Sequence, residues 1–241
     1  MLIIRSLIFN TLMYVVMLVY GVLFLPLAFW SRDATYWALN FYVRTVFWMM
    51  KYIVGIVPEV RGKVPEGEVL IGAKHQSFLD ILILFHALPR AKFIMKKELK
   101  WAFPLGTYAM RIGSTPVDRG KRAVAMKGMV EGVESDTERG QLVIYPQGTR
   151  VAPGAEKPYK IGAGVLYDRM GVVCVPAATN AGLFWGRNTI ARNPGVAIVE
   201  FLEPIDSGLS IQDFIKTLED RVESASDALM AEAGFRADKT P

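Results

Sequence analysis

A histidine and an aspartate stand five residues apart in the segment AKHQSFLD, residues 73–80, where a predicted strand passes into a predicted helix. The side-chain pKa of histidine is about 6.5, so His75 is suited to act as a general base near neutral pH. A carboxylate at Asp80 could hold one imidazole nitrogen and leave the other free to accept a proton, as in a Ser-His-Asp triad. The spacing therefore indicates a candidate catalytic pair.

The same residues have a purely structural interpretation. Ser77 and Asp80 match a capping box, in which a serine begins a helix and an acid three residues later binds the backbone behind it. The two interpretations are compatible, because a carboxylate has two oxygens. No residue nearby is an obvious nucleophile, so a catalytic His75 would have to activate a hydroxyl group of the substrate. The second histidine, His86, is expected to be a partly buried residue near the end of the same helix.

A second turn motif, YPQGTR at residues 145–150, also follows a predicted strand. Proline and glycine favour a tight turn, and Gly148 permits the backbone to approach a ligand closely. Thr149 offers a hydroxyl group, and Arg150 offers a planar guanidinium that can bind an anion through two hydrogen bonds. The motif is therefore a candidate anion-binding turn, although Gly-Thr-Arg alone would be weak evidence.

Basic residues are concentrated between residues 90 and 127, where ten bases stand with two acids. A solvated basic surface would explain most of them, and Lys97 is one member of this group. Arg119 differs because it precedes a glycine at a predicted strand-to-helix corner. Backbone N–H groups and a guanidinium can hold a phosphate at such a corner.

The N-terminal segment is apolar enough to interact with a membrane. Leu7–Trp30 carries no charged residue, and roughly 20 apolar residues span a bilayer core. Ala34–Val57 contains Arg44 and Lys51, which share a helical face with tryptophan, as in helices that lie in the headgroup region. Two spanning helices and a helix pair inserted in one leaflet both remain open. Basic residues before and after these segments favour a cytoplasmic location for the N-terminus and for the bulk of the chain, by the positive-inside rule.

The net charge is unevenly distributed along the 241 residues. The whole chain carries +5, but the residues from Glu200 onward hold ten acids and four bases, so the first 199 residues carry +11. Lipid phosphate or a nucleic acid could attract that charge, and the apolar N-terminus favours lipid. We therefore expect a lipid bilayer as a partner and no nucleic acid. The single cysteine, Cys174, excludes an internal disulfide and a Cys-rich zinc site, and we expect no metal site.

Beyond residue 58 the pattern changes to short apolar runs that alternate with amphipathic segments. This pattern predicts an α/β fold with a mixed, largely parallel sheet flanked by helices. A helix is expected over 122–139, ended by Gly140, and an acidic amphipathic helix is expected over about 209–233. We predict a membrane-associated helix pair at 1–58, followed by an α/β domain at 59–241.

In their order and spacing these segments resemble the 1-acylglycerol-3-phosphate acyltransferase family of glycerolipid acyltransferases, over about residues 60–205. His75 and Asp80 match the family's histidine-to-aspartate block. The segments at 96–120, 145–150 and 175–177 are similar to its second, third and fourth blocks. The N-terminal apolar helices also resemble those of bacterial members, which implies a bacterial inner (cytoplasmic) membrane with the catalytic domain on the cytoplasmic side.

The resemblance implies transfer of a fatty acyl group from acyl-CoA or acyl-carrier protein to the sn-2 hydroxyl of 1-acylglycerol-3-phosphate. The product would be phosphatidate, a phospholipid precursor. His75, oriented by Asp80, would deprotonate the hydroxyl, with no cofactor and no acyl-enzyme. Further residues are implied to bind the substrate: Lys97, Arg119, Gln147, Gly148, Thr149 and Arg150.

The third block departs from the family pattern at one position. Gln147 stands where the family usually has glutamate, so the position keeps an acceptor oxygen and loses the charge. A general base at residue 147 is therefore ruled out. Other acceptors, such as lyso-ornithine lipid or another lysophospholipid, remain open. A lipid-binding membrane protein without activity and a hydrolase in which His75 activates water are the alternatives from other classes.

Overall fold

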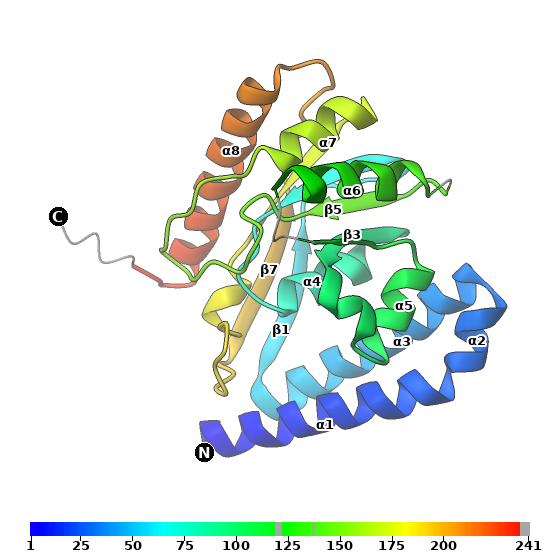
Figure 1. Ribbon diagram of the computed structural model, residues 1–241. Coiled ribbons are helices and arrows are strands. Elements are labelled where there is room, and N and C mark those ends of the chain that lie inside the picture. Colours follow the sequence, from blue (N-terminus) through cyan, green and yellow to red (C-terminus); the bar gives the residue numbers. More distant parts are fainter. Residues whose placement is uncertain (119–121, 137, 237–241) are drawn as a thin grey trace.

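The computed structural model describes residues 1–118, 122–136 and 138–236. In these residues seven strands form one sheet in the order β1-β7-β6-β2-β5-β3-β4 (Figure 1). Strands β6, β2, β5, β3 and β4 run parallel, whereas β7 is antiparallel to β6 and β1 is parallel to β7. The predicted mixed, largely parallel sheet is confirmed. The strands are β1 (Ile56–Arg61), β2 (Val69–Ala73), β3 (Ala91–Lys96), β4 (Thr115–Val117), β5 (Gln141–Ile144), β6 (Cys174–Thr179) and β7 (Gly195–Phe201).

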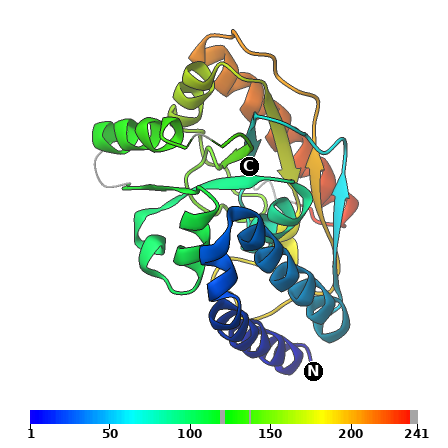
Figure 2. The ribbon, with the colours of Figure 1, turned by 90° about the vertical axis from the view of Figure 1, so that its right-hand side faces the viewer.

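Both faces of the sheet are covered, as expected for parallel strands connected through helices. Side chains of neighbouring residues in a strand point to opposite faces, so β2 contributes to two apolar clusters. Ile71 packs in the cluster that contains α3 (Arg32–Met49) and α4 (Leu79–Ala87). Leu70 packs in the other cluster, with residues of α6, α7 and α8. These three helices lie on the opposite side of the sheet from α3 and α4 (Figures 1 and 2). These helices are α6 (Arg122–Glu134), α7 (Gly162–Met170) and α8 (Ile211–Glu232).

The acidic C-terminal helix α8 follows its predicted bounds to within two residues. Its hydroxyl cap is Ser210, whose Oγ accepts a hydrogen bond from Asp213 N at 3.1 Å. Phe214, Leu218 and Val222 recur every fourth residue and are fully buried, so this stripe packs on the sheet while the acidic face remains in solvent. Gly72 of β2 lies directly against Leu218, and a Cβ there would come within 2.7 Å of that side chain.

The N-terminal helices share a core with the α/β part. Helices α1 (Leu2–Leu23) and α3 lie side by side and are joined through α2 (Leu25–Trp30), as Figures 1 and 2 show. Phe9 and Met13 of α1 are buried in the same cluster as α4. The domain boundary predicted at residue 58 falls inside β1. Among the described residues, α1 is the one helix long and apolar enough to cross a membrane, and only 17% of that apolar window is buried.

Polar contacts also attach the N-terminal helices to the rest of the chain. Arg32, at the start of α3, pairs with Asp136 at 3.0 Å, and Asp136 pairs in turn with Lys92 of β3 at 2.7 Å. At the end of α1, the hydroxyl group of Tyr108 in α5 (Leu105–Arg111) donates to Gly21 O at 3.0 Å. The end of the helix pair at which α2 joins α1 to α3 is therefore held against the α/β part.

Two local predictions were wrong. The helix expected over 122–139 ends at Glu134, and Gly140 instead precedes β5 and packs against the backbone of Arg90. Two residues beyond the helix, Asp136 pairs with Arg32 and Lys92. Strand β1 was not predicted, because Pro58, Glu59 and Arg61 hide its apolar alternation. It is an edge strand beside β7, where proline and charged residues are tolerated.

Candidate active site

His75 and Asp80 meet where β2 ends and α4 begins. The Nδ1 atom of His75 lies 2.9 Å from Asp80 Oδ1, and the Asp80 side chain is fully buried while that of His75 is 13% exposed. With Asp80 ionised, Nδ1–H donates to the carboxylate. Nε2 then carries the free lone pair and has no hydrogen-bond partner in the part of the chain that the structure describes. This is the geometry of an oriented general base.

The second oxygen of Asp80 has the structural role. Asp80 Oδ2 accepts hydrogen bonds from the backbone N–H groups of Gln76 at 2.9 Å and Ser77 at 2.7 Å. Ser77 Oγ accepts from Leu79 N at 3.0 Å and donates to Trp185 O at 2.6 Å. Asp80 therefore caps the helix and contacts the histidine at the same time, and the hydroxyl group of Ser77 is fully used by the backbone.

The His75 ring stacks on Tyr145, the first residue of the second motif. The ring centroids are 3.9 Å apart and the planes are inclined by 18°. Burial and the neighbouring Asp80 charge raise the pKa of Tyr145 well above its ordinary value. The phenol therefore stays neutral at physiological pH, and it supports the imidazole without adding a second negative charge.

Strands β2 and β5 bring the two motifs together. They pair in parallel with Gly72 opposite Ile144, so their carboxyl ends lie at the same edge of the sheet. Gly148 has a φ of 70° and its N–H donates to Tyr145 O at 2.9 Å, which closes the turn. Val151 N then donates to His75 O at 2.8 Å, so the backbone itself ties the turn to the histidine.

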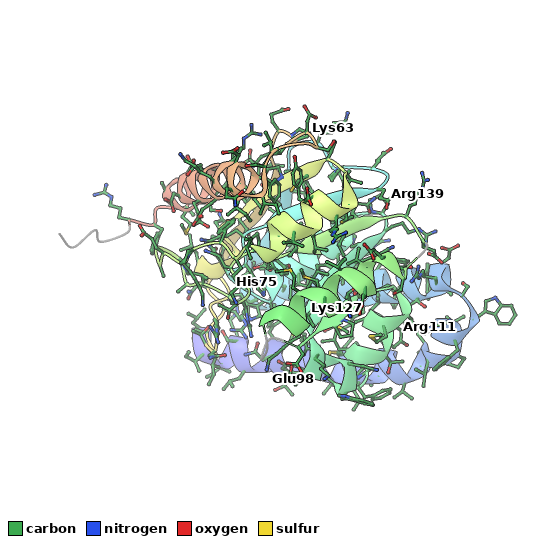
Figure 3. All side chains as sticks on the ribbon, turned by 45° about the horizontal axis from the view of Figure 1, so that its top comes forward. Lys63, His75, Glu98, Arg111, Lys127 and Arg139 are labelled. Carbon is green, nitrogen blue, oxygen red and sulfur yellow. The ribbon has the colours of Figure 1, made fainter. Side chains whose placement is uncertain are left out.

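A cavity of about 510 Å³ opens from His75. Most of its lining is apolar or aromatic and comes from α1, α3, α4, β3 and α5. Its polar lining residues include His75, Lys96, Ser114, Thr149, Arg150 and Arg187. His75 lies toward the middle of the molecule, whereas Lys63, Arg111 and Arg139 lie near its edges (Figure 3). A base, a cation and an apolar space thus lie in one cavity. The apolar lining includes Met17, Leu39, Val43, Phe85, Leu105 and Ala109.

The remaining predicted site residues are placed differently. Lys97 is outside the cavity, in the short helix η2 (Lys97–Trp101), where its ammonium lies 3.3 Å from the carboxylate of Asp118. Arg119 lies outside the described residues. Gln147 is buried and does not line the cavity. Its Nε2 donates to Lys157 O at 3.2 Å and to Glu223 Oε1 at 3.3 Å, a position that favours holding the turn over touching a substrate.

Glu223 belongs to a buried polar cluster that sequence reasoning missed. Its carboxylate pairs with Lys74, which is 97% buried, and it accepts from Tyr159 Oη at 2.9 Å and from Gln147. Lys74 precedes His75 and Gln147 lies inside the second motif, so Glu223 of α8 contacts one side chain from each of the two segments. Lys74 and Glu223 are 149 residues apart, so no local sequence pattern indicates their contact.

Arg187 was also missed, although it lines the same cavity as His75 and Arg150. Its Nη1 donates to Thr149 Oγ1 at 3.4 Å and to Arg150 O at 3.2 Å. It lies in the loop between η3 (Ala181–Leu183) and β7. That loop has no regular pattern, and its nearness to the turn is visible only in three dimensions.

His86 takes no part in this site. Its Nδ1 lies 3.1 Å from Asn40 Oδ1 on α3, and its ring meets Phe47 edge to face. Partial burial and the nearby charge of Arg44 lower the pKa of His86, so it is neutral at physiological pH. It is the residue at the end of α4 that the sequence predicted, although it is more exposed than expected.

Fold and site together define an α/β protein with an oriented His–Asp pair at the carboxyl ends of parallel strands, beside a guanidinium and an apolar cavity. Residues 57–180 match the profile of the Acyltransferase family, which is more than half of the chain. The chain belongs to this family.

Named relatives agree with this assignment. The chain is 28% identical over 155 residues to the 1-acyl-sn-glycerol-3-phosphate acyltransferase of Pseudomonas aeruginosa, covering 63% of this chain and 60% of that protein. It is 30% identical over 186 residues to human 1-acyl-sn-glycerol-3-phosphate acyltransferase alpha, covering 75% and 66%. The match thus spans about two thirds or less of these relatives.

A solved structure shares the fold. The 1-acyl-sn-glycerophosphate acyltransferase PlsC from Thermotoga maritima superimposes with a TM-score of 0.77 at 19% identity, covering 95% of this chain and 97% of that one.

Proposed function

We propose that the protein is a membrane-bound 1-acylglycerol-3-phosphate O-acyltransferase that makes phosphatidate from an acyl thioester. One observation carries the proposal: His75, held through Nδ1 by Asp80, opens into the same cavity as Arg150. The cavity thus places a base, an anion-binding group and space for an acyl chain together. The acyltransferase names of the relatives support the same activity.

The proposed reaction needs no nucleophile from the protein. His75 Nε2 removes the proton from the sn-2 hydroxyl as its oxygen attacks the thioester carbonyl. The tetrahedral intermediate collapses, the C–S bond breaks, and the imidazolium returns the proton to the leaving sulfur. Ser77, the hydroxyl residue nearest in sequence, is fully buried and bonded to Leu79 N and Trp185 O, which argues against an acyl-serine.

The phosphate of the acceptor is proposed to bind at Arg150, with Gly148 and Thr149 forming the turn. A guanidinium binds phosphate through two parallel hydrogen bonds and fixes its orientation. Fixing the phosphate places the sn-2 hydroxyl against His75, and such positioning supplies part of the acceleration. Arg119, which lies outside the described residues, is proposed as a further cation of this site on the family resemblance, whereas the pairing of Lys97 with Asp118 outside the cavity argues against such a role for Lys97.

The apolar part of the cavity is proposed to hold an acyl chain. Its lining from α1, α3, α4 and α5 contains no charged group, so a hydrocarbon chain can be buried there without removing water from a charge. The donor is proposed to be acyl-CoA or acyl-carrier protein, because both present the acyl group as a thioester.

Membrane attachment is proposed to occur through α1 and α3 in one leaflet. Helix α1 touches the α/β part along its length: Ser6 Oγ accepts from Arg192 N at 2.9 Å, Asn10 donates to Ile190 O at 3.1 Å, and Gly21 packs on Pro104. A helix that crossed the bilayer would leave these partners behind. Its outer face is apolar, and exposed tryptophans flank it, as expected at the headgroup region. They are Trp30, Trp37 and Trp48.

An acceptor other than lysophosphatidate is the second candidate, because Gln147 replaces the usual glutamate. Gln147 faces Glu223 and Lys157 instead of the cavity, so its lost charge leaves the acceptor surface unaltered. This placement favours the phosphate-bearing acceptor. The intact geometry of His75 and Asp80 argues against an inactive lipid-binding protein.

An acceptor screen tests the proposal. Purified protein in vesicles is given a labelled acyl donor with 1-acylglycerol-3-phosphate, lyso-ornithine lipid, lysophosphatidylethanolamine or 1-acylglycerol. The proposal requires the highest kcat/KM with 1-acylglycerol-3-phosphate. A higher value with lyso-ornithine lipid or a zwitterionic acceptor would refute it.

A further inference from the structure

Arg187 reaches the phosphate end of the cavity from a part of the chain outside the four sequence blocks. Its guanidinium lies beside the turn that carries Arg150, with Nη1 at 3.4 Å from Thr149 Oγ1 and 3.2 Å from Arg150 O. Both arginines line the cavity that contains His75. We propose that Arg187 binds the phosphate of the acceptor together with Arg150 and selects a phosphate monoester. This inference rests on the proposed function.

The charge balance of this end of the cavity supports the proposal. Across the residues that the structure describes, neither Arg150 nor Arg187 forms an ion pair with a carboxylate. Two arginines that line one cavity without a carboxylate partner leave two positive charges there, which a bound anion would offset. A phosphate monoester carries a charge of about −1.5 to −2 at pH 7 and offers three acceptor oxygens, which matches two arginine forks.

The loop that carries Arg187 is fixed relative to the histidine. Trp185 is buried, and its carbonyl accepts the hydrogen bond from Ser77, two residues from His75. Beyond Arg187 the chain turns at Asn188, which has a φ of 57°, and Thr189 Oγ1 donates to Gly186 O at 3.0 Å. Arg187 therefore projects from an anchored turn, and the spacing between its guanidinium and His75 is set by the fold.

Arg187 retains donors for a ligand after these contacts. A guanidinium has five N–H donors in a planar fork, and the contacts to Thr149 and Arg150 engage Nη1. Its Nε and Nη2 make no hydrogen bond within the described part of the chain. The side chain is exposed to the cavity, so a phosphate could reach these atoms without displacing a protein group.

The test compares steady-state kinetics of the full-length protein and its variants in vesicles. Arg187→Ala should raise the KM for 1-acylglycerol-3-phosphate roughly tenfold, while kcat and the KM for the acyl donor stay within about twofold. Arg187→Lys should recover part of the loss, because it keeps the charge and loses the fork. Arg169→Ala, an exposed arginine on α7 with no ion pair among the described residues, is the matched control and should behave as wild type.

A pH series separates phosphate binding from mere support of the turn. The second pKa of a phosphate monoester is about 6, so the acceptor gains its second charge as the pH rises through that value. The ratio of the KM of Arg187→Ala to that of wild type should therefore increase between pH 5.5 and 7.5.

The outcomes distinguish a failure of the proposed function from a failure of the role proposed for Arg187. If wild type does not acylate 1-acylglycerol-3-phosphate, the proposed function and this inference both fall. If wild type is active but Arg187→Ala has an unchanged acceptor KM, this inference alone is overturned. It is equally overturned if donor and acceptor KM rise together with no pH trend, because Arg187 would then only brace the turn.

Discussion

The carboxylate of Asp80 contacts the backbone through one oxygen and His75 through the other. Oδ2 accepts hydrogen bonds from two backbone N–H groups, and Oδ1 lies 2.9 Å from His75 Nδ1. Because the backbone fixes one oxygen, the other is held rigidly against the imidazole. A helix cap has therefore become the group that sets the tautomer of the histidine.

Asp80→Asn should expose this dependence. The backbone donors require the amide oxygen at the Oδ2 position, so the NH₂ group would face His75 and make Nδ1 an acceptor. Nε2 would then carry the proton and could not act as a base. Turnover should fall by roughly 10⁴-fold, the loss that the wrong tautomer causes in a catalytic triad.

The control for this variant is Asp168→Asn, which makes the same change on the exposed face of α7. Steady-state turnover and the melting temperature are measured for both proteins. An Asp80→Asn variant that folds and keeps most of its activity would remove Asp80 from the mechanism.

Arg150→Ala tests the acceptor phosphate site. A charge-assisted hydrogen bond contributes about 1.5–3 kcal/mol, so the KM for 1-acylglycerol-3-phosphate should rise by about 10- to 100-fold. The KM for the acyl donor should change little, because the thioester lies at the other side of the hydroxyl. An unchanged acceptor KM would point to a neutral or zwitterionic headgroup.

Gln147→Glu would restore the residue usual in the family, and here it should destabilise the fold. The new carboxylate would lie about 3.3 Å from Glu223 Oε1 in a buried site. Two close carboxylates cannot both ionise, so the loss at pH 7 should be on the order of 2 kcal/mol.

The pH dependence of this loss follows from its sign. Burial and the like charge would raise the folded-state pKa of the new glutamate, so the folded state would bind a proton more readily than the unfolded state. The penalty is therefore largest above the raised pKa and disappears as the pH falls below about 4.3, the unfolded value.

A second substitution provides the control. Adding Glu223→Gln to Gln147→Glu keeps one carboxylate near Lys74 and should return part of the stability, which thermal unfolding in detergent would measure. If Gln147→Glu alone is as stable as wild type at pH 7, the repulsion assigned to Glu223 is wrong.

The stability of the protein at acid pH should depend on Asp136, because its carboxylate pairs with Arg32 of α3 and Lys92 of β3. Burial works to raise its pKa, but hydrogen bonds from Lys92 and Arg32 outweigh burial and hold the pKa below its ordinary value. A lowered folded-state pKa means that this stabilisation is present above the unfolded pKa of about 3.9 and is lost as the pH falls through the folded value.

Asp136→Asn should therefore destabilise the protein by about 2–3 kcal/mol at pH 7, because Arg32 and Lys92 would lose their shared carboxylate. The difference from wild type should shrink below pH 4. Exposed Asp227→Asn on α8 is the matched control. Equal denaturation midpoints at pH 7 for wild type and Asp136→Asn would contradict this account.

The sequence was sufficient for the features that depend on local pattern. The strand before His75 is an uninterrupted apolar run, Ser77 and Asp80 form a local cap, and Tyr145–Arg150 is a turn with proline and glycine. Each is visible within a few residues, and the order of the blocks indicated the family. The amphipathic stripe of α8 was visible for the same reason.

What the sequence could not show are contacts between distant segments. Glu223 meets Lys74 across 149 positions, and Arg187 meets the 145–150 turn from a loop without regular pattern. Lys97 has the positive charge that a phosphate site requires, but its side chain pairs with Asp118 and lies outside the cavity. Side-chain direction in irregular segments depends on tertiary packing, which residue type alone does not specify.

The most direct test of the central claim is the turnover of His75→Ala on 1-acylglycerol-3-phosphate. General-base catalysis typically contributes about 10²–10⁴-fold, so turnover should fall by at least that range while the melting temperature and vesicle binding remain those of wild type. His86→Ala, which alters the histidine outside the cavity, should retain wild-type turnover. A folded, membrane-bound His75→Ala protein with activity within tenfold of wild type would contradict the account.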